Sequence, residues 1–388
     1  MSGIVLSASV RQNLLSLQST ADLLATTQNR LATGNKVNSA LDNPTNFFTA
    51  QGLNNRASDI SNLLDSIGNG VQVLQAANTG ITSLQKLVDT AKSIANQVLQ
   101  APAGYTSKST STSTALVGTS SAANLVDGVG FKANQTLAFA ASGELPAFTV
   151  TFGATESLDQ LNTSLAAGGL TASIDSTNHL VITTTNDYAG QTIGTITPGS
   201  TPGTTTFAAG TAPVADAASQ TIRTSLVNQY NGIITQITTT AQDSSFNGIN
   251  LLNGDNLKLT FNETGKSTLN IQGVTFDAAG LGLASLISGT DFLDNASANK
   301  ALTLLGSAST TLRTEASALG SNLSIVQIRQ DFSKNLINVL QTGASNLTLA
   351  DTNEEAANSQ ALSTRQSIAV SALALANQSQ QSVLQLLR

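Results

Sequence analysis

The side chains in this sequence that could do acid–base or metal chemistry are few and scattered. The single histidine, His179, lies near Asp175 and Asp187 along the chain. A metal ion would need more ligands held in a fixed geometry. We therefore interpret His179 as a surface residue beside a turn, and predict neither a metal site nor a catalytic histidine.

A second group of carboxylates, Asp351, Glu354 and Glu355, could indicate a general acid paired with a base. Their position at the start of a predicted helix offers a simpler explanation, since negative charge is favoured at a helix N-terminus. The glycine pairs at residues 68–70 and 280–282 lack the spacing of a phosphate-binding loop, so we interpret them as turns or close contacts. The sequence predicts no catalytic residue and no cofactor site.

The composition also argues against an enzyme. Charged residues make up 10% of the 388 residues and cysteine is absent, which leaves little material for general acid–base or thiolate catalysis. The 17 basic residues form no cluster, so we expect no nucleic-acid partner.

Residues 366–387 are uncharged but carry many Gln and Ser side chains, and we predict no membrane insertion. Residues 1–20 lack the basic and apolar regions of a secretory signal.

Proline positions show where long helices can form. The six prolines are Pro44, Pro102, Pro146, Pro198, Pro202 and Pro213. Proline inside a helix breaks it, so long helices are expected at residues 45–101 and after residue 213. Residues 102–216 differ from both regions, because they are rich in Ser, Thr and Gly.

Heptad spacing predicts the helices. A first stripe ends before Gly34 and comprises Val10, Leu14, Leu17, Ala21, Leu24, Gln28 and Leu31. Asn43-Pro44 is a typical helix start. The helix that follows has two seven-residue columns, formed by Ile60, Ile67, Leu74, Ile81, Val88 and Ala95 and by Leu63, Gly70, Ala77, Leu84, Ala91 and Val98. Twelve such positions strongly indicate a coiled coil.

The C-terminal part repeats this spacing twice. One stripe is formed by Leu302, Leu305, Ser309, Leu312, Ala316, Leu319, Leu323 and Val326, and the other by Ala369, Ala372, Ala376, Ser379, Val383 and Leu386. Ile368 and Leu375 lie beside the second stripe. Long helices near both ends are expected to pair, because each would otherwise expose its apolar stripe.

Residues 102–216 have the alternation of strands. Strands are predicted at residues 134–141, 147–153, 170–175 and 179–185, with a short helix marked by Leu158, Leu161 and Leu165. This segment holds 2 basic and 7 acidic residues, so it carries most of the net charge of −6. We predict a solvent-facing, β-rich insert. A further hairpin is predicted from residues 257–261 and 269–276, and a helix from residues 217–242.

The terminal stripes admit two interpretations. They can form an intramolecular hairpin in a monomeric bundle, or they can pack against other copies of the chain. A single amphipathic helix buries too little apolar surface to offset the entropy of ordering it. This argument favours ends that become ordered on assembly, but periodicity alone leaves both interpretations open.

Three segments resemble bacterial flagellin. Residues 31–42 (LATGNKVNSALD) are similar to the family's LSSGxRINSAxD segment, with Lys36 in place of Arg. Residues 245–252 (SFNGINLL) resemble its TxFNGxxLL segment, and residues 376–388 (ANQSQQSVLQLLR) resemble its C-terminal end. Residues 156–183 are similar, more weakly, to a β–α–β repeat of flagellins and hook-associated proteins.

The resemblance implies a mainly α fold with a β-rich insert. Long antiparallel coiled-coil helices from both termini would form the core and rod layers, and an α+β variable domain would lie outside. Residues 1–35 with 350–388 would form a filament-core layer that is disordered in the monomer. Residues 36–101 with 217–349 would form a rod domain with a short β-hairpin, and residues 102–216 the exposed variable insert. Common flagellins have their variable domain after the second rod helix, whereas this insert precedes it.

The resemblance also implies a function and partners. The chain is expected to self-polymerise into the extracellular flagellar filament for swimming motility. Its expected partners are other flagellin subunits, the flagellar type III export apparatus, a flagellin chaperone that binds near the C-terminus, and hook-associated and cap proteins. A hook–filament junction protein and a surface adhesin that binds glycans through the insert are alternatives. Ser and Thr of the insert are either acceptors for O-linked sugars or parts of solvated loops.

Two sets of residues are predicted to carry the assembly. The predicted polymerisation interface consists of Leu14, Leu17, Leu24, Leu31, Val383, Leu384 and Leu387. The predicted seam of the rod domain consists of Ile60, Ile67, Leu74, Ile81, Val88, Leu312, Leu319 and Val326.

Overall fold

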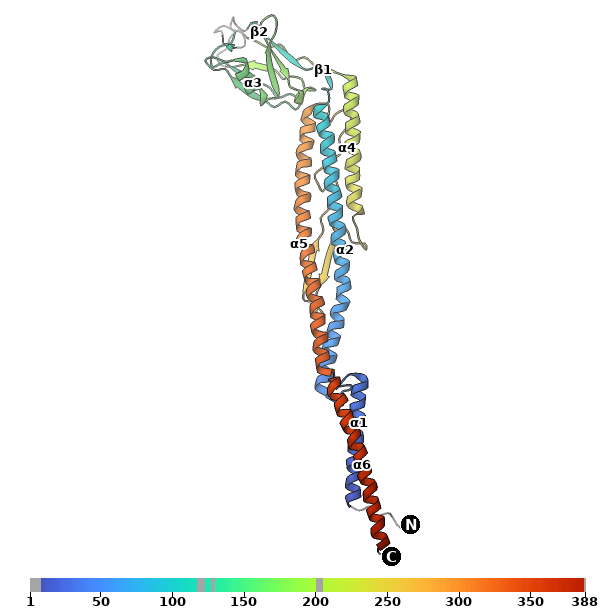
Figure 1. Cartoon of the computed structure of the whole chain (residues 1–388). Coiled ribbons are helices and arrows are strands. Elements are labelled where there is room, and N and C mark those ends of the chain that lie inside the picture. The colour runs from blue at the N-terminus through green and yellow to red at the C-terminus, as the bar shows by residue number, and fades with distance from the viewer. Residues whose placement is uncertain (1–7, 117–122, 127–129, 200–204, 387–388) are drawn as a thin grey trace. The chain divides into compact units, whose positions relative to one another are not determined.

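The computed structural model describes residues 8–116, 123–126, 130–199 and 205–386 of the chain (Figure 1). Its helices are α1 (Ala8–Thr33), α2 (Pro44–Gln100), α3 (Leu158–Ala166), α4 (Ala217–Asp243), α5 (Asn295–Thr348) and α6 (Thr352–Leu386). Most strands lie between α2 and α4, and a further pair lies between α4 and α5. The predicted fold, mainly α with a β-rich insert, is confirmed.

The boundaries of the long helices follow from local chemistry. Gly34 ends α1 in the left-handed conformation, with a φ of +70°, which glycine adopts without steric cost. At the start of α2, the Asn43 side chain accepts a hydrogen bond from the backbone N–H of Asn46 at 3.0 Å, and Pro44 occupies the first helical position. The helix start predicted from Asn43-Pro44 is therefore confirmed.

The contacts divide the chain into two compact units. One comprises Met1–Gly70, Lys258–Leu269 and Ile325–Arg388, and the other Val71–Leu257 and Asn270–Ser324. In the first unit, α2 and α5 pack through Ala57, Ile60 and Leu340, while α1 and α6 lie side by side (Figure 1). The three-part division into core, rod and insert stays a prediction.

The insert, in the second unit, has two three-stranded antiparallel sheets. The first has the order β2-β6-β5, from β2 (Thr110–Leu116), β5 (Leu170–Ile174) and β6 (His179–Thr184). The second has the order β4-β3-β7, from β3 (Thr136–Phe139), β4 (Phe148–Thr151) and β7 (Ile196–Pro198). These sheets and α3 share one hydrophobic core, which includes Phe131, Phe152, Leu161, Leu165 and Ile182. A short pair, β1 (Tyr105–Ser107) with β8 (Val214–Ala215), joins the two ends of the insert.

The predicted hairpin between α4 and α5 forms, although its second strand is shorter than predicted. β9 spans Asn256–Thr260 and β10 spans Thr268–Gln272. The second strand stops before Gly273. A Cβ atom at this position would lie 2.2 Å from the Asp255 carbonyl oxygen and 2.7 Å from the Leu251 carbonyl oxygen, so only glycine fits here. The chain then hydrogen-bonds to another segment, with the Val274 N–H donating to the Leu251 carbonyl at 2.8 Å.

Candidate self-assembly surface

The terminal helix pair has a narrow and partly polar interior. On α6 the less exposed positions recur at alternating spacings of three and four, and they are Ser359, Leu362, Gln366, Ala369, Leu373 and Ala376. Facing residues of α1 are half-buried or buried and include Val10, Asn13, Leu17, Leu24 and Thr27. Large apolar side chains therefore alternate with alanine and polar side chains along the contact. Most of the side chains at this contact are only half-buried.

The stripe predicted for this part of α6 is wrong at two positions. Ala372 and Ser379 are exposed, and Leu373 takes the inner position after Ala369. The observed stripe runs from Ala369 to Leu373 and then to Ala376, which are steps of four and three residues. The predicted stripe ran from Ala369 to Ala372 and then to Ala376, which are steps of three and four. Both steps fit a helix, so the sequence pattern could not decide between them.

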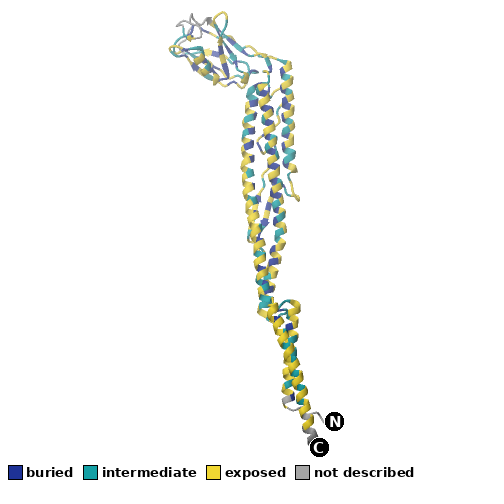
Figure 2. Ribbon diagram, in the orientation of Figure 1, coloured by how far each residue is buried: buried dark blue, intermediate teal, exposed yellow. Residues whose placement is uncertain are grey.

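Several large apolar side chains of the same two helices lie on the outside. Leu15 is 70% exposed and Leu375 is 72% exposed, and Leu23, Ile368 and Val370 are exposed as well. Figure 2 shows that exposed residues predominate along the two terminal helices. Exposed apolar residues on a soluble monomer are ordinary when isolated, but a set of them along both members of one helix pair indicates a surface that another molecule covers. We use the name outer apolar face for the exposed residues Leu14, Leu15, Leu23, Leu31, Ile368, Val370 and Leu375, which are spread over more than one side of the two helices.

The predicted interface residues fall into three groups. Leu17 and Leu24 are half-buried against the neighbouring helix, whereas Leu14 and Leu31 are each 40% exposed and belong to the outer apolar face. Val383 and Leu384 lie in α6, but their side chains lie outside the described part of the structure. Leu387 lies outside the described residues. Their role as a polymerisation interface stays a prediction, and the heptad pattern alone did not single out Leu15 or Leu23.

The loop between α1 and α2 fastens the terminal pair to the end of α5. The Lys36 N–H donates to the Thr348 carbonyl at 2.7 Å, and the Ala350 N–H donates to the Gly34 carbonyl at 2.9 Å. The loop itself is closed by Asp42, which accepts hydrogen bonds from the Asn38 and Ser39 N–H groups. The backbone hydrogen bond from Ser39, followed by that from Asn38, lowers the pKa of Asp42.

The carboxylates at the start of α6 have structural roles. The Asp351 side chain accepts the N–H of Asn353 at 2.9 Å and that of Glu354 at 3.3 Å, which caps the helix. The Glu355 carboxylate is buried and lies 3.1 Å from the Arg30 guanidinium of α1. This ion pair links the last turn of α1 to the first turn of α6, as the antiparallel arrangement of the two helices requires.

The predicted rod seam is buried at every one of its positions. Each of its members is at most 2% exposed: Ile60, Ile67, Leu74, Ile81, Val88, Leu312, Leu319 and Val326. In the second unit α4 adds the buried residues Val227, Tyr230 and Ile237. The seam residues therefore lie inside the subunit and are unavailable to partners in this conformation.

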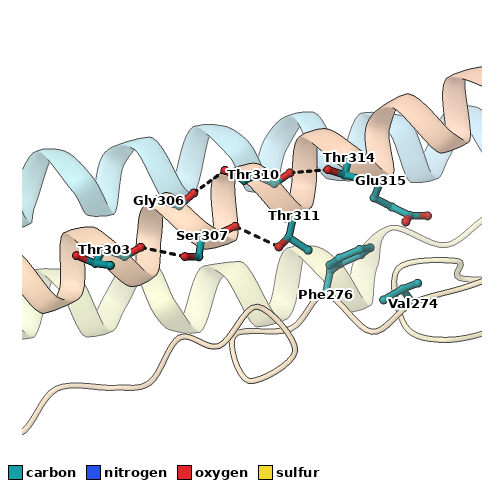
Figure 3. Close-up of a pocket in the computed structure, with 9 residues that line it drawn as sticks. All are labelled: Val274, Phe276, Thr303, Gly306, Ser307, Thr310, Thr311, Thr314 and Glu315. Atoms are coloured by element: carbon teal, nitrogen blue, oxygen red, sulfur yellow. Dashed lines mark hydrogen bonds between the residues drawn. The ribbon is translucent and has the colours of Figure 1, made fainter.

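A groove of about 690 Å³ lies in the second unit, between α5 and the segment around Phe276 (Figure 3). Its α5 wall is lined by Thr and Ser. The hydroxyls of Thr310, Thr311 and Thr314 donate back to carbonyls one turn earlier, at 3.1 Å each. These hydroxyls are satisfied within the helix. Glu315 also lines the groove, and burial raises its pKa.

The junction of α2, α4 and α5 holds a buried charge cluster that was not predicted from the sequence. The Arg223 guanidinium of α4 donates to the carbonyls of Pro102 at 2.8 Å, Phe292 at 2.7 Å and Ala101 at 3.2 Å. Asp294, which precedes α5, is buried nearby. Burial raises its pKa to about 6, the Glu144 carboxylate adds to this, and Arg223 opposes it. These contacts give the cluster a structural role at the helix ends.

His179 is the first residue of β6 and lies beside a turn, as predicted from the sequence. Its backbone N–H donates to the Asp175 carboxylate at 2.9 Å, and its Nδ1 atom lies 2.9 Å from the Thr177 hydroxyl. Among the described residues, no group of three or more His, Cys, Asp or Glu could hold a metal ion. In the same part of the chain, no helix is long and apolar enough to cross a bilayer.

Comparison with known families identifies both ends of the chain. Residues 5–132 match the bacterial flagellin N-terminal helical region, and residues 302–387 match the bacterial flagellin C-terminal helical region. The first match includes α1 and α2, and the second includes α6 and most of α5. Thus both helices that bear the outer apolar face belong to matched regions.

Individual relatives agree with the family match. The chain is 33% identical to flagellin FljM and to flagellin FljK of Caulobacter vibrioides, over 168 residues in each case. Those matches cover 42% of this chain and 59% of each relative, so the chain spans about three fifths of their length. It is also 35% identical to flagellin A of Rhizobium meliloti over 124 residues, which is 32% of this chain and 27% of that relative.

Proposed function

Since the chain belongs to the bacterial flagellin family, we propose that it is a structural subunit that polymerises with copies of itself into the flagellar filament. The outer apolar face on α1 and α6 is the observation that carries this proposal. A monomer that leaves Leu15 and Leu375 in water gains free energy when another subunit covers them. Flagellins are structural proteins, and we propose no catalytic activity.

The narrow interior of the terminal pair supports coupling between order and assembly. Helices whose contact alternates half-buried leucines with alanine and polar side chains gain little free energy from each other. Contacts from neighbouring subunits would supply the missing burial. We propose that residues 1–35 with 350–388 form the filament core, residues 36–101 with 217–349 the rod layer, and residues 102–216 a solvent-exposed insert.

The family also supports specific partners and a location. We propose that the chain leaves the cell unfolded through the flagellar type III export apparatus, after a chaperone has bound it near the C-terminus. A chain without cysteine forms no disulfide that would obstruct such a route. Outside the cell it would add to a filament that begins on hook-associated proteins and grows under a cap protein.

The test removes residues 1–30 and, separately, replaces one residue of the outer apolar face. Both the deletion variant and Leu15→Ala are expected to give soluble protein. The deletion variant should form no filament, whereas Leu15→Ala should raise the critical concentration for polymerisation at least about tenfold, because a buried leucine contributes ~2–5 kcal/mol in a close-packed contact.

Ser19→Ala on the same helix is the matched control and should polymerise as the unmodified chain does. Electron microscopy and sedimentation of seeded protein give the readout. Normal filaments from the chain without residues 1–30 would refute the proposal. Failure of the unmodified chain to elongate filament seeds would favour a junction protein instead.

A further inference from the structure

One edge of the first sheet of the insert has no neighbouring strand in the described part of the chain. In the order β2-β6-β5, β5 pairs with β6 on one side only. Across this pair the Thr185 N–H donates to the Gly169 carbonyl, and the Asp175 N–H donates to the His179 carbonyl. Odd-numbered residues therefore bond toward β6. Antiparallel strands alternate, so Leu170, Ala172 and Ile174 direct their N–H and C=O groups outward.

A helix side chain occupies the centre of that edge. The Asn162 amide of α3 donates to the Ala172 carbonyl at 3.2 Å, and its oxygen accepts the Ala172 N–H at 2.5 Å. The Thr171 hydroxyl donates to the same oxygen at 3.2 Å. One side-chain amide thus makes the two hydrogen bonds that a residue of an adjacent strand would make.

We propose that Asn162 locks the outer edge of β5 and so prevents this edge from adding an extended strand of a second copy of the chain. The partner that the edge would accept is a β-strand, through main-chain hydrogen bonds to Leu170, Ala172 and Ile174. Asn162 takes the central position of that ladder, and an incoming strand would have to displace it.

The sequence of β5 shows why this edge needs protection. Residues 170–174 (LTASI) combine apolar and β-branched residues with no charge and no proline. Segments of this kind add strands readily when their edge is open, and proteins usually place a charge or a proline there. Such protection exists at other edges of the insert: β7 contains Pro198, and residues 205–211 hydrogen-bond along the free side of β2.

The position of Asn162 within α3 supports a specific role. Asparagine is a poor residue for a helix interior, because its side chain competes for backbone hydrogen bonds. α3 already has a capping box, formed by Ser157 and Gln160, and places Leu161 and Leu165 in the core. An alanine at position 162 would favour the helix itself. The presence of asparagine at position 162 is therefore explained by its hydrogen bonds to Ala172, and not by the stability of α3.

The test compares three variants of the full chain. Asn162→Ala removes both hydrogen bonds and opens the edge. Asn162→Asp can still accept the Ala172 N–H, cannot donate to its carbonyl, and places a negative charge at the edge that repels an incoming strand. Thr163→Ala is the control, because the Thr163 hydroxyl only donates back to the Asp159 carbonyl of the same helix.

Association is followed by thioflavin fluorescence and by the infrared band of intermolecular β-sheet, which a helical filament does not give. Asn162→Ala is expected to associate at least about tenfold faster than the unmodified chain, while Thr163→Ala and Asn162→Asp do not. The proposal is overturned if Asn162→Ala behaves as Thr163→Ala does, or if Asn162→Asp associates as fast as Asn162→Ala. The readout is independent of filament formation.

Amide hydrogen exchange of the unmodified chain decides the question if Asn162→Ala does not fold. The Ala172 amide, held by Asn162, should exchange at least about tenfold more slowly than the outward amide of Ile174. Equal exchange rates at these two outward amides would show that Asn162 does not hold the edge, and would overturn the proposal.

Discussion

Arg223 and Asp294 carry the main buried charges at the junction of α2, α4 and α5. Arg223 satisfies carbonyl groups that the end of α2 leaves without a helical partner, at Ala101 and Pro102. Asp294 gains less. It accepts the Ser297 N–H at 3.4 Å, and burial raises its pKa more than this hydrogen bond and Arg223 lower it. Its ionised form is therefore unfavourable in the folded protein.

This imbalance predicts a pH-dependent effect of Asp294→Asn. The pKa of Asp294 is about 6 in the folded protein and 3.8 as the reference for the unfolded chain. Below about pH 3 the carboxyl is protonated in both states and costs nothing. As the pH rises from about 4 to 6, the unfolded chain ionises this carboxyl while the folded protein keeps it protonated, so the folded protein loses stability; above pH ~6 both states are ionised and the cost is complete. Asparagine removes this cost and can still cap α5.

We expect Asp294→Asn to be more stable than the unmodified chain by roughly 1–2 kcal/mol at pH 7.5, and about equally stable at about pH 3. Urea unfolding followed by circular dichroism at the two pH values measures the difference. An advantage of the same size at both pH values would mean that the substitution acts through packing rather than through ionisation.

Part of this residue-scale detail was visible in the sequence. Arg223 follows Ser219 and precedes Leu226 and Tyr230 on the buried face of α4, so an arginine at a seam position was a usable signal. Asp294 offered none, because its burial depends on segments that lie far apart along the chain. The outward positions of Leu15 and Leu23 were equally hidden, since apolar periodicity does not tell an inner stripe from an outer one.

The long helices were more predictable than the strands. Heptad columns along α2 and α5 reflect a repeated contact with one partner, and the sequence records it directly. β2 illustrates the opposite case. Ser111 and Ser113 fill its buried positions and donate or accept hydrogen bonds there, so no apolar alternation marks the strand. β1, β7 and β8 were missed as well, because each is only two or three residues long.

The glycines of α2 give a prediction at the scale of the element. Glycine weakens a helix relative to alanine by roughly 0.5–1 kcal/mol. At Gly52 an added Cβ would meet no atom within 4 Å, whereas at Gly80 it would lie 2.2 Å from the Ser244 Oγ and 2.6 Å from a methyl group of Leu252. The turn after α4 therefore packs directly on the backbone of α2 at Gly80.

We expect Gly52→Ala to stabilise the protein by roughly 0.5–1 kcal/mol and Gly80→Ala to destabilise it by about 1–3 kcal/mol. Thermal unfolding of the two variants, followed by circular dichroism, provides the comparison. If Gly80→Ala were as stable as Gly52→Ala, the turn would not be held against α2.

At the scale of the whole molecule, the insert and the helical parts bury different sets of apolar side chains. The insert has a core of its own, with Phe131, Phe152 and Ile182 fully buried. The helices instead bury the seam residues of α2 and α5, and their matched family regions extend to both ends of the chain. An insert with its own core can be gained or lost without changing the seam.

The β1–β8 pair allows this independence to be tested by excision. Tyr105 pairs with Ala215 and Ser107 pairs with Val214, so the chain enters and leaves the insert at neighbouring points. Residues 108–213 can therefore be replaced by Asn-Gly, which favours the tight turn of a two-residue hairpin. Arg223 and its partners Ala101, Pro102 and Phe292 remain in place.

We expect the shortened chain to be soluble, to keep the helical circular dichroism of α2, α4 and α5, and to form filaments when seeded. The physical reason is that none of the seam residues and none of the outer apolar face lies within the excised segment. As a comparison, the same Asn-Gly replacement is made at residues 262–265, the β9–β10 turn. It removes the ion pair between Glu263 and Arg56, which contributes little because the Arg56 side chain is half exposed, and this variant should also form filaments. A shortened chain that folds but does not elongate seeds would place an essential subunit contact in the insert; loss of helical signal would instead show that the insert supports the seam.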